Sequence, residues 1–419
     1  MVAIGVGGMV GGGIFAVLGL AVQMAHGGTP LAFALAGGVA LLTTYSYARL
    51  SVAYPSRGGT VTFLDRSFGT GMFSGSMNVL LWLSYVEMLS LYALAFGSYA
   101  ATFLPPPWQP IGKHALLSLG VVALTGLNLL SARSIGKAQT WIVGVKVAIL
   151  LLFVATGITV IHASQIAPGS WSPPLQLTAG GMIIFLAYEG FELIANSAQD
   201  VRDPARTLPR AYYLSVGFVI ALYILVSLVT VGNLSIDAIV AAKDYALAEA
   251  ARPFLGHAGF VLIAVAAMRS TASAINATLY GAARLSYVIA KDGELPAMLE
   301  RNVWNQPAAG LLITAALTLL TANAFDLTSV ATLGSGGFLL IFAAVNTANA
   351  RQAKRTGSRA WISLIGAVAC MAALAALIWQ TAHTAPAKLW VLAGMFGLAN
   401  AIEGAYRLAG KRTQPRGDT

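Results

Sequence analysis

The sequence predicts an all-α polytopic membrane protein, and three observations lead to this fold class. Of the 419 residues, 57% are hydrophobic and only 10% are charged, whereas a soluble domain carries about 25% charged residues. Whole blocks such as residues 311–324 carry no charge at all. The Lys and Arg residues gather in alternate loops. Together these observations exclude a soluble enzyme, a nucleic-acid-binding domain and a disordered chain.

Twelve apolar runs are predicted to form transmembrane helices, because a helix needs roughly 20 residues to cross a bilayer. They cover residues 2–24, 30–54, 72–103, 115–131, 138–162, 176–198, 210–233, 257–290, 307–324, 327–350, 359–381 and 387–408. Spans three and eight are the longest, so we expect them to tilt or to continue beyond the membrane. The amphipathic segment 236–252 is predicted to be a surface helix that lies over the bundle.

The basic residues predict the orientation. Twelve spans place both termini on one side, and 19 of the 25 Lys and Arg residues lie in loops on that side. Four lie on the other side, and Lys146 and Arg269 lie within spans. The positive-inside rule makes the basic side cytoplasmic. We therefore expect a multi-pass protein of the cell membrane with both termini in the cytoplasm, whose net charge of +10 reports topology rather than an acidic partner.

Two of the predicted spans are poor straight helices. Residues 5–15 read GVGGMVGGGIF, and each of three consecutive glycines costs about 1 kcal/mol relative to alanine inside a helix. Residues 180–192 place Gly190 and two acids in the sixth span. Two glycine-interrupted spans at matching positions of two halves indicate a transporter site.

An unwound helix inside a membrane needs partners for its backbone groups, and a polar ligand can supply them. Freed N–H groups at a helix start suit a carboxylate, and freed carbonyls suit an ammonium group. The two breaks together therefore suit an amino acid. The alternative is that Gly8, Gly12 and Gly19 only allow close helix packing, as in GxxxG pairs.

At these residues the sequence resembles the amino acid–polyamine–organocation permeases. Residues 11–15, GGGIF, resemble the signature of their first helix, and residues 185–192, FLAYEGFE, with 203–211, DPARTLPRA, resemble their sixth-helix motif. Residues 290–296, AKDGELP, resemble the end of their eighth helix. The similarity covers nearly the whole chain. It is greatest to prokaryotic, proton-coupled, sodium-independent transporters of broad specificity.

The resemblance implies a LeuT-like fold of 12 transmembrane helices with a 5+5 inverted repeat. Residues 1–162 would form the first repeat and residues 176–350 the second. Two additional helices would follow in residues 359–408, and residues 409–419 would be a cytoplasmic tail. The expected mechanism is alternating access, in which helices 1, 2, 6 and 7 rock against helices 3, 4, 8 and 9.

The resemblance also implies a substrate site for amino acids. The N–H groups of Gly12, Gly13 and Ile14 would bind the carboxylate. The carbonyls of Met9, Leu186 and Glu189 would receive the α-amino group. The complete expected set is Met9, Gly11, Gly12, Gly13, Ile14, Phe185, Leu186, Tyr188, Glu189, Gly190 and Glu192. We expect protons as the coupling ion, and no metal or other cofactor.

Ionisable residues at membrane depth carry the coupling predictions, because each costs at least about 2.5 kcal/mol if it is unpaired. They are Glu87, Lys146, Glu189, Glu192 and Arg269. On spacing alone, Lys146 is able to extend its side chain toward the cytoplasm. The resemblance instead implies that Lys146 is the proton-coupling group and that Ser273 lines the same pocket. Loss of water disfavours a charged lysine, so its charge can respond to ambient pH.

The buried acids leave the substrate class open. Glu192 matches a position that is acidic in the family's cationic amino acid exchangers, where it would bind a substrate amine or a proton. Glu87 and Glu189 are expected to form an internal ion pair with Arg269. A cationic amino acid or polyamine permease or exchanger therefore remains the alternative function.

Other classes of membrane protein fit the sequence less well. A major facilitator transporter would carry a basic pair in the loop after span two, where residues 63–69 read FLDRSFG. A membrane-embedded enzyme, the remote alternative, would need a cluster such as HExxH, but the five histidines lie far apart in sequence. A channel would need a filter sequence.

Cys370 is the sole cysteine, which excludes an intramolecular disulfide. We therefore predict a transporter rather than an enzyme, with its oligomeric state open.

Overall fold

A computed structural model describes residues 1–130, 135–291 and 308–408, and these residues form helices joined by short links. The first part holds α1 (Val2–Met9), α2 (Gly13–Ala25), α3 (Thr29–Ala53), α4 (Thr60–Phe68), α5 (Met72–Ala101), η1 (Pro106–Trp108) and α6 (Gln109–Leu130). The second holds α7 (Ile135–Gly157), η2 (Ile158–Val160), α8 (Ala163–Ile166), η3 (Pro168–Ser170), α9 (Pro174–Ile183), η4 (Ile184–Tyr188), η5 (Phe191–Asp200), α10 (Pro204–Asn233), α11 (Ile236–Ala242), η6 (Lys243–Tyr245) and α12 (Ala246–Lys291). The third holds α13 (Ala308–Ala324), α14 (Leu327–Arg351), α15 (Ala353–Thr356), α16 (Ala360–Thr384) and α17 (Ala387–Leu408).

The predicted all-α polytopic fold is confirmed. Ten helical segments of the described chain are long and apolar enough to cross a membrane, and α1 with α2 forms an eleventh as a bent pair. Each of the twelve predicted spans contains a helix, but α13 has only 17 residues and falls short of that length. The count of twelve spans therefore stays a prediction.

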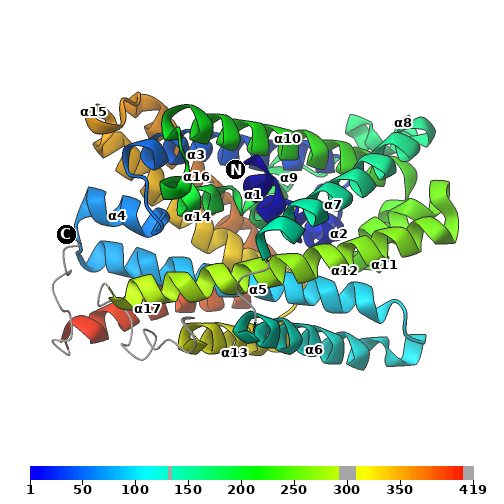
Figure 1. Cartoon of the computed structure of the whole chain (residues 1–419). Helices are drawn as coiled ribbons and strands as arrows, with labels where there is room; N and C mark the ends of the chain where they lie inside the picture. Colours follow the sequence, from blue (N-terminus) through cyan, green and yellow to red (C-terminus); the bar gives the residue numbers. More distant parts are fainter. Residues whose placement is uncertain (131–134, 292–307, 409–419) are drawn as a thin grey trace.

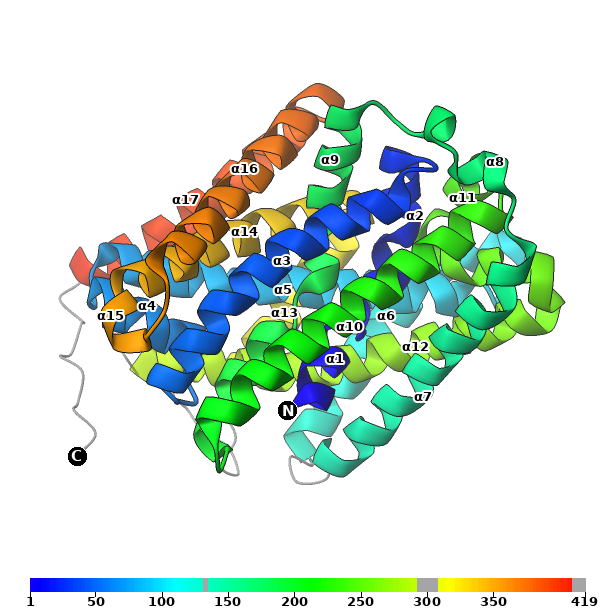
Figure 2. The same ribbon diagram turned by 90° about the horizontal axis from the view of Figure 1, so that it is seen from above.

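Most long helices lie across the view in Figure 1, and Figure 2 shows that α3, α10 and α16 are inclined to α12. The short helices α4 and α15 lie at the left end of the bundle in Figures 1 and 2, and α8 and α11 lie at the right end. Burial differs between the centre and the periphery of the bundle. Of the most apolar 18-residue stretch of each helix, 89% is buried in α5 and in α14, but only 22% in α6 and in α17. The core therefore forms around α5, α14 and the broken helices.

The long helix α12 changes direction at Gly256, whose φ of 63° lies in the left-handed region. Before this bend, the predicted surface segment 236–252 is helical, as α11, η6 and the start of α12. Its apolar side packs on the bundle, because Ile239 and Ala242 form a buried cluster with Val22 and Val231.

A buried group of polar side chains, here called the polar seam, joins α3, α14 and α16. It consists of Thr43, Ser46, Asn346, Asn349, Ser363 and Cys370. The Ser46 hydroxyl donates to Asn346 Oδ1 at 2.6 Å, and Asn346 Nδ2 donates to Thr43 Oγ1 at 3.0 Å. Asn349 Nδ2 donates to Ser363 Oγ at 2.8 Å. Helix α3 is thereby fixed to α14 and α16, which lie about 300 residues later in the sequence.

The division into two inverted repeats and two added helices stays a prediction. The predicted tail, residues 409–419, and residues 292–296 of the eighth-helix motif lie outside the described residues.

Candidate functional site

The first predicted helix break is confirmed. Helix α1 ends at Met9, α2 begins at Gly13, and the two axes differ by 44°. Gly12 precedes α2 as its N-cap and has no side chain to satisfy the first backbone donors of that helix. In the described chain, no hydrogen bond is found for the N–H groups of Gly12 and Gly13, whereas the Ile14 N–H group is directed at the Tyr223 hydroxyl. The Gly12 and Gly13 groups form a pair of free donors at the positive end of α2.

The second predicted break lies between η4 and η5. Gly190 has a φ of +117°, a conformation that side chains other than glycine rarely adopt. Helix α9 and the 3₁₀ turn η4 approach the break from one side, and η5 leaves it on the other. The 3₁₀ geometry is typical of a helix under local strain.

The two breaks touch each other. A Cβ atom placed on Gly8 would lie 2.8 Å from the Gly190 carbonyl oxygen, and one placed on Gly13 would lie 2.7 Å from Ala187 Cα. Both glycines therefore let two backbones come into direct contact. The close-packing interpretation holds for Gly8 and Gly12, since a Cβ on Gly12 would enter the Tyr92 ring. Close packing by these glycines occurs together with the helix breaks, so it is not an alternative to them.

Three hydroxyl groups from other helices bind the freed carbonyls. Tyr223 of α10 donates to Met9 O at 2.7 Å and to Ala187 O at 3.2 Å, so one phenol joins both breaks. Ser270 of α12 donates to Val10 O at 2.9 Å and also to Gly11 O.

Ser335 of α14 forms hydrogen bonds with the backbone that precedes the second break. Its hydroxyl donates to Ile183 O at 2.8 Å and accepts from Leu186 N at 3.0 Å. The sequence did not single out Tyr223, Ser270 or Ser335. The only available signal was a lone hydroxyl in an apolar span.

The expected ammonium-binding carbonyls already have partners within the chain. Met9 O accepts from Tyr223, and Leu186 O accepts from the Glu189 N–H group at 3.2 Å. A carbonyl oxygen has two lone pairs, so each retains capacity for a second donor. The role of these carbonyls stays a prediction.

Lys146 lies inside the bundle. Its side chain is 4% exposed, and Nζ donates to Gly7 O in α1 at 3.0 Å. The alternative in which Lys146 extends to the cytoplasm is therefore wrong for this conformation. Ser273 lies on α12 and is partly buried, and within the described chain no hydrogen bond joins it to Lys146. The hydroxyl of α12 that reaches the first break is that of Ser270.

The acids of the second break have different surroundings. Glu192 is 1% exposed and accepts from Gly190 N at 2.7 Å and from the Tyr85 hydroxyl at 3.1 Å. Glu189 is fully buried, and neither of its carboxyl oxygens has a hydrogen-bond partner. Glu87 is 7% exposed and has one oxygen without a partner.

The predicted ion pair with Arg269 is wrong. The Arg269 side chain is exposed on α12, whereas Glu87 and Glu189 are buried. No ion pair in the described chain joins Arg269 to an acid. Arg269 shares its helix face with the exposed residues Leu262 and Val265, so it points away from the breaks.

All eleven predicted substrate-site residues are buried, and they come from the two breaks that touch. They are Met9, Gly11, Gly12, Gly13, Ile14, Phe185, Leu186, Tyr188, Glu189, Gly190 and Glu192. The structure therefore shows a conformation in which this region is closed to water. The Tyr188 hydroxyl donates to Phe33 O at 2.8 Å, so it contributes to the contact with α3. The ring of Tyr92, which the sequence did not single out, packs against Gly12, and the Tyr92 hydroxyl has no hydrogen-bond partner.

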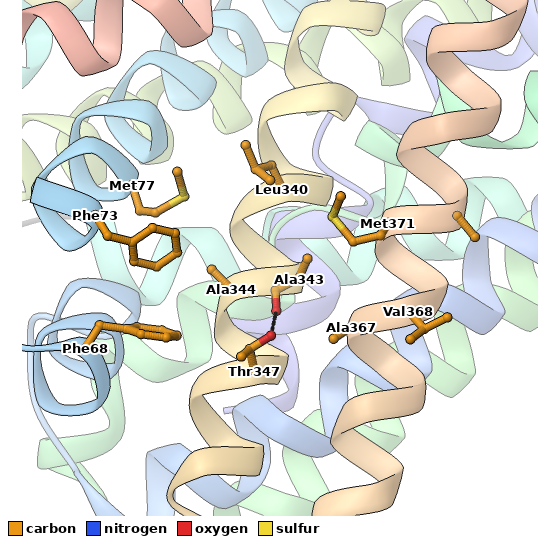
Figure 3. Close-up of a pocket in the computed structure, with 11 residues that line it drawn as sticks. Phe68, Phe73, Met77, Leu340, Ala343, Ala344, Thr347, Ala367, Val368 and Met371 are labelled. Atoms are coloured by element: carbon orange, nitrogen blue, oxygen red, sulfur yellow. Dashed lines mark hydrogen bonds between the residues drawn. The ribbon is translucent and has the colours of Figure 1, made fainter.

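A cavity of about 570 Å³ lies away from the breaks, between α4, α5, α14 and α16 (Figure 3). Its side chains are almost all apolar, and the Thr347 hydroxyl within it donates to Ala343 O of its own helix. Phe73 and Met371 at its edge are about half exposed. It offers neither charge nor free donors to an amino acid, so we do not place the substrate there. In the described chain, no group of three or more His, Cys, Asp or Glu side chains is arranged to hold a metal.

Comparison with known proteins decides the family. A family model described as "Amino acid permease" matches residues 1–399. The chain belongs to the amino acid permease family. An uncharacterized protein of Methanocaldococcus jannaschii is 35% identical over 98% of this chain and 95% of its own length. The inner membrane transport protein YbaT of Escherichia coli is 34% identical over 94% of this chain and 92% of its own.

More distant members of the amino acid permease family have names that state a substrate. The branched-chain amino acid permease BcaP of Lactococcus lactis is 28% identical over 81% of this chain and 78% of its own. The chloroplastic cationic amino acid transporter 9 of Arabidopsis thaliana is 29% identical over 72% of this chain and 56% of its own. The family resemblance read from the sequence is confirmed, which argues against the major facilitator alternative. The roles of individual site residues stay predictions.

Proposed function

We propose that this protein is a secondary active transporter that moves amino acids across the cell membrane by alternating access. The observation that carries the proposal is the pair of free N–H groups at Gly12 and Gly13, at the start of α2, which lies against the second helix break. Backbone donors at the start of a helix favour a carboxylate. Every amino acid has that group, whatever its side chain.

Coupling to protons rather than sodium is the second part of the proposal. Lys146 supplies a fixed amine to the Gly7 carbonyl, next to the first break. In this proposal, the Lys146 amine takes the place at the Gly7 carbonyl that a sodium ion would otherwise occupy. Its protonation would then change how strongly α7 is bound to α1.

A cationic substrate is the second candidate, and the acids of the second break favour it. Glu189 and Glu192 are both buried, and no basic side chain of the described residues forms an ion pair with either. A lysine, arginine or polyamine substrate would bring the missing positive charge. The name of the Arabidopsis relative agrees with this candidate, whereas that of the Lactococcus relative agrees with an apolar substrate.

The proposed motion uses the two breaks as joints. The segments α1–α2, α3, α9–η5 and α10 would rock against α5, α6, α12 and α13 and open the site to one side at a time. Both termini would face the cytoplasm, because most Lys and Arg residues lie in the loops on their side.

Uptake into proteoliposomes tests the proposal. Purified protein is given an inward proton gradient in sodium-free buffer, and uptake of radiolabelled L-alanine, L-leucine and L-arginine is measured with and without a protonophore. We expect saturable uptake that the protonophore suppresses and that sodium does not increase. Competition by a panel of unlabelled neutral and basic amino acids then ranks the two candidates. Absence of protein-dependent uptake for every amino acid, or a strict need for sodium, would overturn the proposal.

A further inference from the structure

The carboxyl groups of Glu189 and Glu192 lie on either side of Gly190 in the sequence, and only that of Glu192 accepts hydrogen bonds from the protein. Glu192 accepts one hydrogen bond from a backbone N–H group and another from Tyr85. Such donors replace water around a carboxylate and stabilise its charge. Glu189, three residues earlier, is equally buried but has no donor at either oxygen.

No positive charge compensates Glu189. The groups that interact with it electrostatically are Glu192 of η5, Tyr47 of α3, Tyr85 and Tyr92 of α5, and Cys370 of α16. None of these groups is basic, and the Glu192 carboxylate repels a second negative charge. The Lys146 amine donates to Gly7 O, and Arg269 is exposed on another face of the bundle.

An ionised carboxylate in this position would be unfavourable by several kcal/mol, because it has lost water and gained neither a donor nor a cation. Binding a proton removes that charge. A neutral carboxyl group is far less costly to bury without partners than a carboxylate. The closed conformation therefore fits a neutral Glu189.

We propose that Glu189 is a proton-binding site of the transport cycle, separate from Lys146. When the site is open to water on one side, a carboxylate oxygen of Glu189 takes a proton from a hydronium ion and forms an O–H bond. The bond persists while the site is closed. When the site opens to the other side, the proton returns to water and the carboxylate is restored. This inference rests on the proposed transport function and adds a second proton site to it.

Counting protons per transported amino acid tests the proposal. Glu189→Gln keeps the size and the neutral form of the side chain but cannot carry a proton. In proteoliposomes, the membrane potential at which net L-alanine or L-arginine flux reverses gives the number of protons moved with each substrate. We expect this number to fall by one in Glu189→Gln. Glu87→Gln is the matched control, because Glu87 is also a buried acid with an unpartnered oxygen but lies on α5, and its number should equal that of the unaltered protein.

An unchanged number in Glu189→Gln would overturn the proposal. So would a variant that selectively loses L-arginine flux while keeping the full number of protons with L-alanine, since Glu189 would then be a substrate-amine site. If Glu189→Gln folds but does not transport, infrared spectra of the purified, substrate-free protein decide instead.

The infrared measurement depends on no substrate, so it separates this inference from the proposed function. At neutral pH, the C=O stretch of a protonated carboxyl group should lose intensity in Glu189→Gln. The same band should persist in Glu192→Gln, because Glu192 has donors that favour its ionised form. A band of equal intensity in Glu189→Gln and the unaltered protein would refute the proposal, even if transport itself were established.

Discussion

The hydroxyl of Tyr223 bonds to both helix breaks, so a single side chain fixes the distance between two backbones that have lost their own hydrogen bonds. Tyr223→Phe removes the donor for Met9 O and Ala187 O and leaves both carbonyls buried. An unsatisfied buried carbonyl costs about 1–3 kcal/mol. We therefore expect the variant to unfold several degrees below the unaltered protein in a thermal melt.

Tyr212→Phe provides the control for that prediction. Tyr212 is also fully buried, but its hydroxyl joins only another hydroxyl, that of Ser51, at 3.0 Å. Its loss should lower the melting temperature less. Equal melting temperatures for the two variants would show that Tyr223 does not hold the breaks.

Lys146 is the residue on which proposed proton coupling depends. Lys146→Ala removes the amine bonded to Gly7 O, so we expect uptake that no longer varies with external pH, from a protein that still elutes as one species. Lys113→Ala, which removes a partly exposed ion pair with Asp244, should keep the pH profile. Proton dependence that survives in Lys146→Ala would contradict the assignment.

At the scale of elements, the second break depends on one glycine. Gly190→Ala would place a side chain at φ +117° and against the backbone of Gly8. The backbone strain alone costs about 1–3 kcal/mol, and the contact adds to it. We expect a large drop in thermal stability and in the yield of monodisperse protein.

Gly217→Ala is the matched substitution in a regular helix. A Cβ on Gly217 would meet no atom within 4 Å, and the residue lies inside α10. Alanine favours a helix over glycine by about 1 kcal/mol, so this variant should melt at the same temperature or higher. A tolerated Gly190→Ala would mean that the break does not need glycine.

The start of α14 gives an expectation for acid stability. Burial opposes ionisation of Asp326, but hydrogen bonds from Ser329 and Lys388 outweigh it and hold the pKa of Asp326 below its ordinary value. A lowered pKa in the folded state adds stability above the ordinary aspartate value of about 4, and this contribution is lost as the pH falls through the folded-state pKa. Asp326→Asn should therefore lower the melting temperature at pH 7. The difference should shrink below about pH 4, and a difference independent of pH would contradict the assignment.

The sequence predicted both helix breaks because glycine acts locally: three in a row weaken any helix, and Gly190 follows an acid in a span that should hold none. It did not predict Tyr223 or Ser335, because a hydroxyl in an apolar span gives the same pattern whether it bonds its own helix or a neighbour.

The wrong pairing of Arg269 has a different cause. Charge signs say which residues are able to pair, but only the helix face says which ones meet. Leu262, Val265 and Arg269 repeat at helical spacing on one exposed face. That spacing was present in the sequence and indicates a side chain directed away from the core.

At the scale of the whole molecule, the predicted orientation is open to a direct test. Ser358 lies in the basic link between α15 and α16, and Gly169 lies near α8 at the opposite end, with open space around it. In whole cells, a membrane-impermeant thiol reagent should label Gly169→Cys and leave Ser358→Cys unlabelled until the cells are opened. Both variants carry Cys370→Ala, which removes the one native thiol. The reverse pattern would place the termini outside.

The polar seam has a consequence for how such a molecule could move. Helix α3 belongs to the group of helices proposed to rock, yet it is bonded through Ser46, Thr43 and Asn346 to α14, which lies outside that group. Sliding α3 along α14 would strand buried amide and hydroxyl groups, at about 1–3 kcal/mol for each. Turning about the seam would leave every one of those bonds in place. We therefore expect α3 to turn about the polar seam rather than to slide along α14, so that Thr43, Ser46 and Asn346 restrict the direction in which the rocking helices can move.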